Sequence, residues 1–527
     1  MLRLVILLIL IAPVVGPCDK KRPQPQPPPP VATPTVEPTP VATPTIEPTP
    51  QASPTATPRV KPTPYPVPVV DLAPYLHEQG GQVVIVDVTG IEDVGPAINA
   101  ADNFDGPGKL IISGGGKIKT QVVLKHDSQW SGEYFCDVET WEGCVLLRDN
   151  TTMQGGTFHE PNFIFENVPS ITVIQTYASA KNNYASCENV TVKGVTILGR
   201  QTKTDGGVRQ AISFGNCKTC AAIENDLSGI ASIGIQFGGG AADGHHAENV
   251  LAYRNKLRRF AAAAIALVNY KGARVSQNDI RDPGRRRGEP GGVSGIDIET
   301  NGTDDCAERP VIDSNYIGYG NAAFQSIGNG ILGQNVYKTP CSGGLLIANN
   351  VIDGWEGRNG LEASEQWGLS GGLYFVGNWP GGLSVNNTII RALQPAMSFY
   401  GVTGLTSQDD EIISSGGGGQ GAIYLEGSTG NTFIRLRRFD DPRISPGSTG
   451  HWVQCDETSG VNVFKDSEVS VPDVCKTERQ EDKHQEEAQS HSLTTDDDSG
   501  GIPGWVHLGI GYSFWLFWLS YNRRRYA

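Results

Sequence analysis

The chain has 527 residues, of which 38% are hydrophobic, enough for one large core or two ordinary ones. It contains 65 glycines and 35 prolines, a composition that favours turns over long helices. The formal net charge is −14 and there is no long basic run, so a nucleic-acid partner is disfavoured.

The N-terminus has the pattern of an export signal followed by a spacer. Residues 1–18 predict a signal peptide, because Arg3 precedes an apolar run that is short for a bilayer-spanning helix. The run ends at Cys18, as in bacterial lipoproteins, but Pro17 replaces the small residue of that pattern. Ordinary cleavage, a retained anchor and lipidation therefore stay open. Residues 19–69 are rich in proline and threonine and predict a disordered linker of extended polyproline II conformation.

Residues 70–144 are expected to form an N-terminal cap and the first coils of a repeat. Residues 83–86 and 110–112 predict short strands, and residues 91–101 predict a brief helix, although they contain an internal Gly-Pro. A stack of coils needs such a cap because its end would otherwise expose unpaired strand edges.

Residues 145–475 are dominated by a short frame, which is a small residue followed by an aliphatic, any and an apolar residue. The frame opens at Ala211, Gly234, Ala264, Gly295, Gly330, Gly372, Ala396 and Ala422. The spacings range from 23 to 42 residues, as expected if loops of different length are inserted at fixed corners. Each repeat is too short to bury its own apolar face, so the repeats must stack.

A second marker alternates with this frame, namely an Asn or Asp two residues before an aliphatic residue. It occurs at Asn225, Asn255, Asn278, Asn315, Asn350, Asn387 and Asp410. Asn at one corner would stack as a hydrogen-bonded ladder and would also tolerate the turn geometry. Leucine-rich repeats and propellers need denser or longer repeats. We therefore predict an all-β protein with a right-handed parallel β-helix, its handedness following from the crossover rule.

With this frame and this ladder, roughly residues 75–471 resemble the right-handed parallel β-helix superfamily of pectate lyases, polygalacturonases and related surface proteins. The resemblance carries no signature of one subfamily. It implies a solenoid whose outer faces bind or process carbohydrate.

One frame, Gly295 to Glu299, places two acids on the same face of a strand. Side chains alternate along a strand, so Ile296 and Ile298 should point inward while Asp297 and Glu299 point outward. Stacked frames would align outward residues in two columns. The first column would hold Ser213, Gln236, Ala266, Asp297, Tyr374, Ser398 and Tyr424, and the second Gly215, Gly238, Val268, Glu299, Tyr400 and Glu426.

Acidic groups beside tyrosine faces suit an extended sugar chain, which needs hydrogen-bond acceptors and flat apolar surfaces. The candidate substrate-binding residues of these columns are Gln236, Tyr374, Tyr400, Tyr424 and Glu426. The alternative is a solvated outer face on which the tyrosines only stabilise the sheet.

Two reactions are compatible with the acidic pair. In a hydrolase, Asp297 and Glu299 would be the catalytic carboxylates, at the longer separation of roughly 6.5–9.5 Å used by inverting glycosidases. Asp304-Asp305-Cys306 resembles an element of polygalacturonases, but Ser294 stands where that family has Asp, and its Gly-His-Gly and Arg-Ile-Lys elements are missing.

In a lyase, the relevant segment is Arg281 to Arg286, which resembles the Arg-x-Pro-x-x-Arg pattern of pectate lyases. The resemblance implies Arg281 as catalytic base, Arg286 as a substrate-binding residue, and Asp297 and Glu299 as calcium ligands. The Trp-Ile-Asp-His element of that family is missing, and a solvated Arg-rich loop is the alternative.

Cysteine spacing in an exported protein predicts local disulfides. The expected pairs are Cys136/Cys144, Cys306/Cys341 and Cys455/Cys475, with Cys217 bonded either to Cys220 or to Cys187 one coil earlier. A zinc site at this C-x-x-C would need a second pair of ligands, which the sequence does not offer, so a disulfide is the favoured interpretation.

The C-terminal region changes composition twice. Residues 476–503 predict a polar, acidic linker. Residues 504–527 are apolar and aromatic and end in an Arg cluster, which predicts a membrane anchor, although an aromatic tail packed on the solenoid end is the alternative.

The sequence thus predicts a secreted or cell-surface β-helix, tethered to a membrane through its termini, that binds an extracellular polysaccharide. It leaves open whether the protein cleaves that glycan, as a lyase or hydrolase around Asp297, or is a noncatalytic adhesion protein displaying loops.

Overall fold

A computed structural model describes most of the central part of the chain. The described residues are 63–76, 80–138, 143–160, 172–181, 186–199, 210–230, 232–238, 246–260, 262–281, 293–300, 308–318, 328–335, 344–353, 371–392, 395–413, 422–439, 452–467, 471–472 and 475. The chain divides into a unit of residues 1–60, outside the described residues, and a unit of residues 61–527. Within the described part, no helix is long and apolar enough to cross a membrane. The predicted signal peptide and C-terminal anchor lie outside it.

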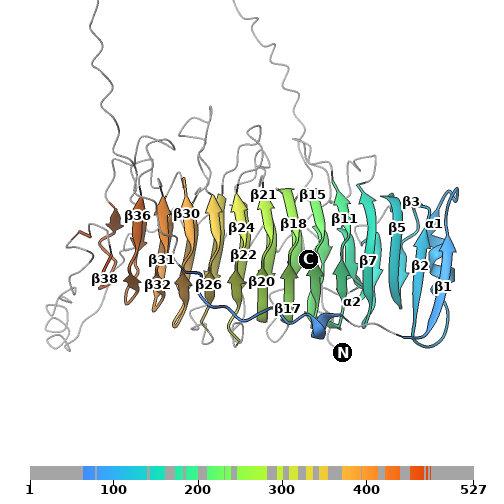
Figure 1. The fold of residues 1–527 in the computed structure, drawn as a ribbon, viewed down its shortest axis with the longest axis horizontal. Coiled ribbons are helices and arrows are strands. Elements are labelled where there is room, and N and C mark those ends of the chain that lie inside the picture. The colour runs from blue at the N-terminus through green and yellow to red at the C-terminus, as the bar shows by residue number, and fades with distance from the viewer. Residues whose placement is uncertain are drawn as a thin grey trace, which may run out of the picture. The chain divides into compact units, whose positions relative to one another are not determined.

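The described strands form two parallel sheets, one of twelve strands and one of 26 (Figure 1). Along the solenoid, each strand of the twelve-stranded sheet is followed in the chain by one or more strands of the 26-stranded sheet until the next coil begins. The twelve-stranded sheet contains β4 (Val122–Leu124), β6 (Val145–Leu147), β8 (Thr172–Thr176), β12 (Gln210–Ser213), β16 (Ile233–Phe237), β19 (Ala263–Val268), β22 (Val293–Thr300), β25 (Gly328–Asn335), β28 (Leu373–Asn378), β31 (Met397–Thr403), β34 (Ile423–Glu426) and β37 (Val453–Cys455).

The 26-stranded sheet contains β1 (Gln82–Asp87), β2 (Gly108–Ser113), β3 (Gly116–Ile118), β5 (Asp127–Cys136), β7 (Thr152–His159), β9 (Ser186–Glu188), β10 (Thr191–Lys193), β11 (Thr196–Leu198), β13 (Asn216–Lys218), β14 (Ala221–Ile223), β15 (Asp226–Ile230), β17 (Ala247–Tyr253), β18 (Lys256–Phe260), β20 (Tyr270–Ser276), β21 (Asp279–Arg281), β23 (Val311–Asp313), β24 (Tyr316–Gly318), β26 (Leu346–Ala348), β27 (Val351–Asp353), β29 (Leu383–Val385), β30 (Thr388–Ile390), β32 (Thr406–Gln408), β33 (Glu411–Ile413), β35 (Thr432–Ile434), β36 (Arg437–Phe439) and β38 (Val463–Lys465). The fold is the predicted right-handed parallel β-helix.

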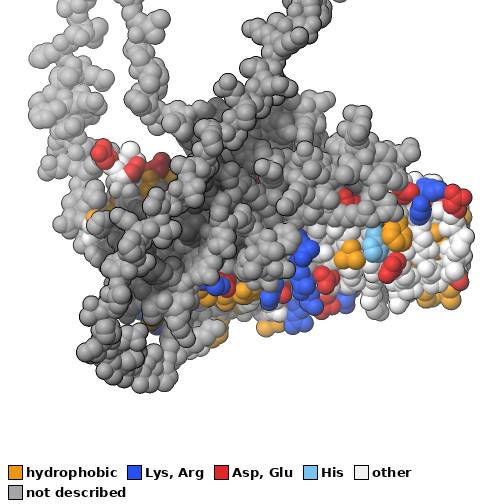
Figure 2. All heavy atoms as spheres, turned by 90° about the horizontal axis from the view of Figure 1, so that it is seen from above, with side chains coloured by type: hydrophobic (Ala, Val, Ile, Leu, Met, Phe, Trp, Pro, Cys, Tyr) orange, Lys and Arg blue, Asp and Glu red, His pale blue; other side chains and the backbone are white. Residues whose placement is uncertain are grey.

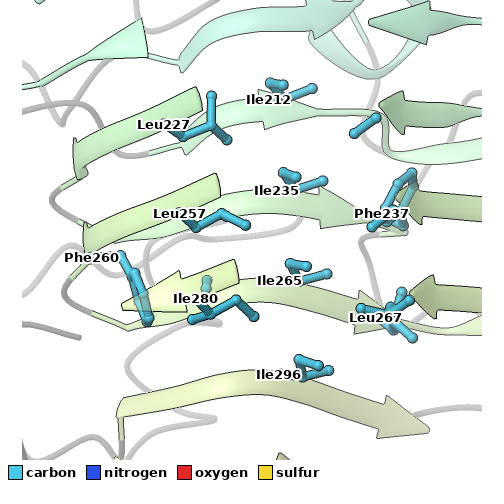
Figure 3. Packing of buried hydrophobic residues seen from close by; sticks show 14 of the residues in the cluster. Ile212, Leu227, Ile235, Phe237, Leu257, Phe260, Ile265, Leu267, Ile280 and Ile296 are labelled. Carbon is cyan, nitrogen blue, oxygen red and sulfur yellow. The ribbon is translucent and has the colours of Figure 1, made fainter. Parts of the chain in front are cut away.

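All eight predicted frames lie on the twelve-stranded sheet, where their aliphatic residues stack inside the solenoid (Figure 3). Ile235, Ile265 and Ile296 pair in register on neighbouring coils and are fully buried. Burying a side chain of this size stabilises the fold by roughly 1.5–3 kcal/mol. The stack therefore contributes to the stability of every coil it passes through.

The small residue that opens a frame is small because its side chain would enter the core. A Cβ built at Gly295 would lie 2.5 Å from Cγ2 of Ile317 and 2.7 Å from the carbonyl oxygen of Gly330. Gly330 and Gly372 face the equivalent isoleucines, Ile352 and Ile389, at 2.4 and 2.5 Å. Close approach of the two sheets thus accounts for the repeated glycine.

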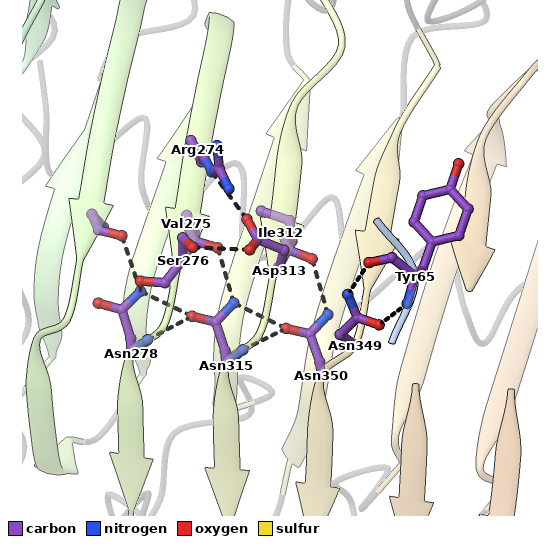
Figure 4. Close-up of polar contacts among 11 residues, drawn as sticks. Tyr65, Arg274, Val275, Ser276, Asn278, Ile312, Asp313, Asn315, Asn349 and Asn350 are labelled. Carbon is purple, nitrogen blue, oxygen red and sulfur yellow. Dashed lines mark hydrogen bonds and ion pairs between the residues drawn. The ribbon is translucent and has the colours of Figure 1, made fainter. Parts of the chain in front are cut away.

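The predicted ladder is present and buried (Figure 4). Asn278 donates its amide Nδ2 to Oδ1 of Asn315 at 2.9 Å, and Asn315 donates in the same way to Asn350 at 3.0 Å. Each asparagine rung also donates to a backbone carbonyl, as Asn315 does to Val275 at 2.9 Å. The left-handed backbone belongs to the residue before each rung, for example Ser314 with φ 58°. The rungs supply hydrogen bonds, whereas the turn geometry is taken by their predecessors.

The N-terminal cap has the predicted strands and helix. Helix α1 (Val94–Ala101) begins after Asp93, whose side chain accepts a hydrogen bond from the Gly95 N–H. Pro96 lies in the first turn, where a missing N–H breaks no intrahelical bond, so the Gly-Pro does not prevent the helix. A second helix, α2 (Tyr177–Lys181), was not predicted. Near the cap, the visible described surface mixes acidic, basic and apolar side chains (Figure 2).

Two of the predicted disulfides are present, Cys136–Cys144 and Cys455–Cys475, and the third pair lies outside the described residues. Cys217 is bonded to Cys220 rather than to Cys187. Cys187 keeps a free, buried thiol, although it lies directly beside Cys217 in the register of the neighbouring strands.

Residues 63–76 lie across the outer face of the 26-stranded sheet, where Figure 1 shows a blue segment crossing the strands between β26 and α2. Residues 63–69 belong to the predicted linker, yet Tyr65 and Val67 pack on the solenoid. A short 3-10 helix, η1 (Ala73–Tyr75), follows. We call residues 63–76 the clasp segment.

Candidate functional site

The outer face of the twelve-stranded sheet carries the predicted first column and, from Val268 onward, the predicted second column, with some members that sequence reasoning missed. Gly215 and Gly238, predicted for the second column, lie beyond the ends of β12 and β16. The first column runs through Leu146, Gln175, Ser213, Gln236, Ala266, Asp297, Leu332, Tyr374, Ser398, Tyr424 and Gln454. The second runs through Val268, Glu299, Gln334, Val376, Tyr400 and Glu426. We call the two columns together the strip.

Two of the missed residues, Leu332 and Gln334, lie in the coil that follows Asp297. Their positions could have been found by aligning Gly330 with Gly295, because the same offsets lead from each glycine to the two columns. Sequence reasoning left this coil empty since its frame, Gly330-Ile331-Leu332-Gly333, has glycine where the others have a large apolar residue.

Asp297 and Glu299 project from the same face of β22, as predicted, and their side chains are partly buried. Their carboxyl groups share a hydrogen bond, and Gln334 on the next coil donates a second one to Asp297. The predicted longer separation of an inverting glycosidase is therefore wrong, because carboxyl groups in hydrogen-bond contact are closer than that. The two acids form one unit that can hold a shared proton.

The electrostatics of this pair favour a protonated acid. Burial first, and then the neighbouring Glu299 carboxylate, raise the pKa of Asp297 well above its ordinary value. Oδ1 of Asp297 is buried and has no hydrogen-bond partner in the described part of the chain. A buried oxygen of this kind is costly unless a ligand or water satisfies it. The pair can thus donate a proton, or a hydrogen bond, to a bound group.

Three tyrosines follow the acidic pair along the strip. The rings of Tyr374 and Tyr400 stack with centroids 4.9 Å apart, and Tyr400 contacts Tyr424 at 5.6 Å. Tyr424 donates its hydroxyl to Glu426 at 2.9 Å. Burial raises the pKa of all three hydroxyls, that of Tyr400 to about 12, so they remain neutral donors at neutral pH. Tyr374 lies two coils beyond Asp297, roughly 10 Å along the axis.

Amide side chains lie on the other side of the acidic pair. Gln210 donates to Oε1 of Gln236, and Gln236 donates to the carbonyl of Gly238 at 3.1 Å. One coil before Ser213, Gln175 donates to Ser179 at 3.3 Å. The strip therefore has an uncharged polar half, an acidic centre and an aromatic half.

Arg281, the predicted base of a lyase, is placed on the other sheet. It ends β21, where it forms an ion pair with Asp279 at 2.6 Å and lies over the ring of Tyr316 at 4.8 Å. These contacts are those of a surface arginine held by its own sheet, and no described contact joins it to Asp297. Arg286 and the Asp304-Asp305-Cys306 element lie outside the described residues.

The predicted calcium site at Asp297 and Glu299 can be compared with the set of oxygen ligands that calcium requires. Calcium takes six to eight oxygens, usually from several carboxylates. Among the described residues, the sole cluster of three or more metal-binding side chains is Cys187, Cys217 and Cys220, and it does not include Asp297 or Glu299. Two carboxyls and the Gln334 amide are only part of such a set within the described residues, so the calcium site stays a prediction.

No family model and no curated protein matches the chain. Several solved structures do. A DFA-IIIase of Arthrobacter chlorophenolicus A6 in complex with GF2 is 13% identical, over 75% of this chain and 96% of that one, with a TM-score of 0.43. The A-module of an Azotobacter vinelandii mannuronan C-5 epimerase is 14% identical, over 72% and 92%, with a TM-score of 0.39. A surface adhesin of Streptococcus pneumoniae is 12% identical, over 69% and 89%, with a TM-score of 0.39. At such identities these likenesses say nothing of this chain's substrate.

Proposed function

We propose that this protein is an exported, surface-tethered β-helix that binds an extracellular polysaccharide along the strip and hydrolyses it at the Asp297–Glu299 pair. The observation that carries the proposal is the partly buried, proton-sharing acid pair, which lies between a row of amides and a row of tyrosines. A chain of sugars needs hydrogen-bonding side chains for its hydroxyls and flat apolar faces for its rings. The strip offers amides on one side of the acids and tyrosine rings on the other.

The charge of the strip favours a neutral glycan over a uronate. A polyuronate carries one carboxylate per sugar and needs cationic side chains or calcium to neutralise it. The two columns of the strip contain Asp297, Glu299 and Glu426 but no lysine or arginine among their described members. An anionic chain would be repelled there, so hydrolysis of a neutral polysaccharide is favoured over elimination from a uronate.

In hydrolysis the acidic pair would protonate the oxygen of the leaving sugar. Burial and the neighbouring Glu299 raise the pKa of Asp297, and this makes it the better proton donor of the two. As the glycosidic bond breaks, a water molecule adds to the anomeric carbon and gives its proton to Glu299, which returns it to Asp297 through their shared hydrogen bond. Gln334 fixes the orientation of Asp297, and the tyrosine rings hold the chain across the pair.

The second candidate function is a noncatalytic surface or adhesion protein. It is favoured by the same tyrosine row, since stacked rings bind sugars without any acid. In that case the strip would bind the glycan and Asp297 would contribute only a hydrogen bond.

The test is incubation of the full chain with neutral and uronate polysaccharides, with products and binding followed together. Asp297→Asn is expected to lower the hydrolysis rate by about 10²- to 10⁴-fold while leaving binding nearly unchanged. Tyr400→Ala is expected to weaken binding by about tenfold, whereas Tyr400→Phe keeps the stacked ring and should bind normally. Glu188→Gln, which removes an exposed acid from the other sheet, is the matched control.

Each outcome decides between the candidates. Cleavage of a neutral glycan that Asp297→Asn abolishes supports the hydrolase. Binding without product from any glycan, unaffected by Asp297→Asn, supports the adhesion protein. Products carrying the unsaturated end of an elimination reaction would overturn the choice of hydrolysis.

A further inference from the structure

The outer face of the 26-stranded sheet has a built site for an extended peptide, and the clasp segment fills it. Backbone N–H of Tyr65 donates to Oδ1 of Asn349 at 2.8 Å, and Nδ2 of Asn349 donates back to the carbonyl of Tyr65 at 2.8 Å (Figure 4). The side-chain amide thus pairs with the peptide as a neighbouring strand would. Asn349 itself has φ 57° and receives a third bond, from Asn386, at 2.7 Å.

Two apolar patches hold the rest of the clasp segment. Tyr65 and Val67 pack on a patch formed by Leu346, Ala348 and Val385. A second patch, toward the cap, receives the apolar side chains of the following residues. It consists of Ala221, Ile223, Leu251 and Tyr253, and is contacted by Val70, Leu72 and Tyr75.

A hydrogen bond closes the far end of the segment. Thr191 donates its hydroxyl to the carbonyl of Tyr75 at 2.6 Å. From β10, which contains Thr191, to β26 there are five strand steps, roughly 24 Å at 4.8 Å per step. The residues from Tyr65 to Tyr75 span roughly 30 Å as polyproline II, so an extended chain fits this distance. The prolines of the segment favour that conformation before it docks.

We propose that the outer face of the 26-stranded sheet is a binding site for a proline-rich peptide, and that residues 63–76 of the same chain occupy it as a clasp. The docked clasp fixes where the preceding chain leaves the solenoid. The chain leaves beside β26, far along the stack, rather than at the capped end near β1. It also leaves on a different sheet from the strip. The purpose of this arrangement rests on the tethering in the proposed function, since the clasp segment itself docks on a different sheet from the acidic pair and the tyrosines. The clasp itself does not depend on glycan binding.

The first test measures how often the clasp opens in the full chain. Chymotrypsin can cut after Leu72 and Tyr75 only when the segment is undocked, and the cutting rate then follows the open population. Asn349→Gly keeps the left-handed corner but removes the amide that pairs with Tyr65. It is expected to speed cutting by about tenfold, as the loss of about 1.4 kcal/mol of hydrogen bonding would.

Ser314→Gly is the matched control for Asn349→Gly. Ser314 has the same left-handed corner on the preceding coil, with φ 58°. The control should be cut at the wild-type rate. Equal cutting of wild type and Asn349→Gly would overturn the clasp, because Asn349 would then hold nothing.

The second test asks whether the site recognises the peptide in trans. In a full-length variant with Tyr65→Ser, Val67→Ser and Leu72→Ser the site should be vacant. A fluorescent peptide of residues 63–76 is expected to bind it and a scrambled peptide is not. Failure of the peptide to bind a variant that retains its β-sheet circular dichroism would refute the site. Glycan binding by the same variants separates the two proposals, because the strip lies on the other sheet.

Discussion

The last rung of the ladder, Asp410, offers a sharp test of how the solenoid is stabilised. Its Oδ1 accepts hydrogen bonds from the backbone N–H and the side-chain Nδ2 of Asn387 at 2.8 and 2.9 Å. Its Oδ2 accepts from the hydroxyls of Ser384 and Ser407, both at 2.7 Å. The side chain is completely buried, in a position where the preceding rungs are asparagine. Asp410→Asn therefore removes a buried charge and keeps the shape of the ladder.

The magnitude follows from the pKa of Asp410, which burial raises from 3.8 to about 6 against the opposing effect of its hydrogen bonds. The native state then holds the proton up to about pH 6, whereas the unfolded chain releases it near pH 4. The stability associated with the proton is present below about pH 4 and is lost as the pH rises to about 6. Two pKa units correspond to about 3 kcal/mol, so Asp410→Asn is expected to raise the free energy of unfolding by about 1–3 kcal/mol at neutral pH.

The assay is urea unfolding of both proteins between about pH 4 and pH 8, together with hydrogen exchange of the Asn387 amide, which reports the local opening of this rung. The gain should shrink toward zero at the acid end. A difference that does not change with pH, or a loss of stability at neutral pH, would refute the reasoning. The reverse change, Asn350→Asp, should destabilise at neutral pH, because the new carboxylate cannot donate to the Ile312 carbonyl as Asn350 does at 2.9 Å.

Two further predictions concern the core. Gly295→Ala is expected to destabilise the protein by about 1–3 kcal/mol, because the new methyl group meets Ile317, and an unchanged melting temperature would contradict this. The Cys187 thiol, whose pKa burial raises to about 12, should react with iodoacetamide far more slowly in the native than in the unfolded protein, since near pH 8 only on the order of one thiol in 10⁴ is ionised. Mass spectrometry of labelled peptides measures the difference, and equal rates would show that the thiol is accessible.

The regular part of this fold is readable from its sequence because the solenoid repeats the same physical requirement. Each coil must bury an aliphatic residue such as Ile296 and must satisfy a corner with an amide such as Asn315. These requirements recur, so they leave a pattern. The residue with the left-handed backbone, which stands just before each rung, varies in type, for example Ser314 and Asn349. Because it leaves no pattern, the sequence predicts the turn geometry at the rung instead.

The clasp segment shows what a local pattern cannot supply. Alternating prolines predict an extended conformation, and residues 63–71 have it before η1 begins, but nothing in Tyr65 or Val67 indicates which surface they meet. The hydrogen-bond partner of Tyr65, Asn349, is 284 residues away from it in the sequence. Only the stacked coils bring Leu346 and Val385 together as an apolar patch, so the contact is a property of the fold.

The same distinction applies to the acidic pair, whose stability cost argues for a function. The inward residues of β22 are required by the solenoid, whereas the outward positions of the neighbouring coils are held by uncharged residues such as Ala266 and Leu332. Two carboxyls on one strand face destabilise a sheet unless they share a proton. Asp297→Asn should therefore stabilise the protein at neutral pH, by an amount that vanishes in acid, while it lowers the rate of the proposed hydrolysis. Because a raised pKa makes the native acid lose stability as the pH rises, a variant that loses both stability and activity would show that Asp297 supports the fold rather than the reaction.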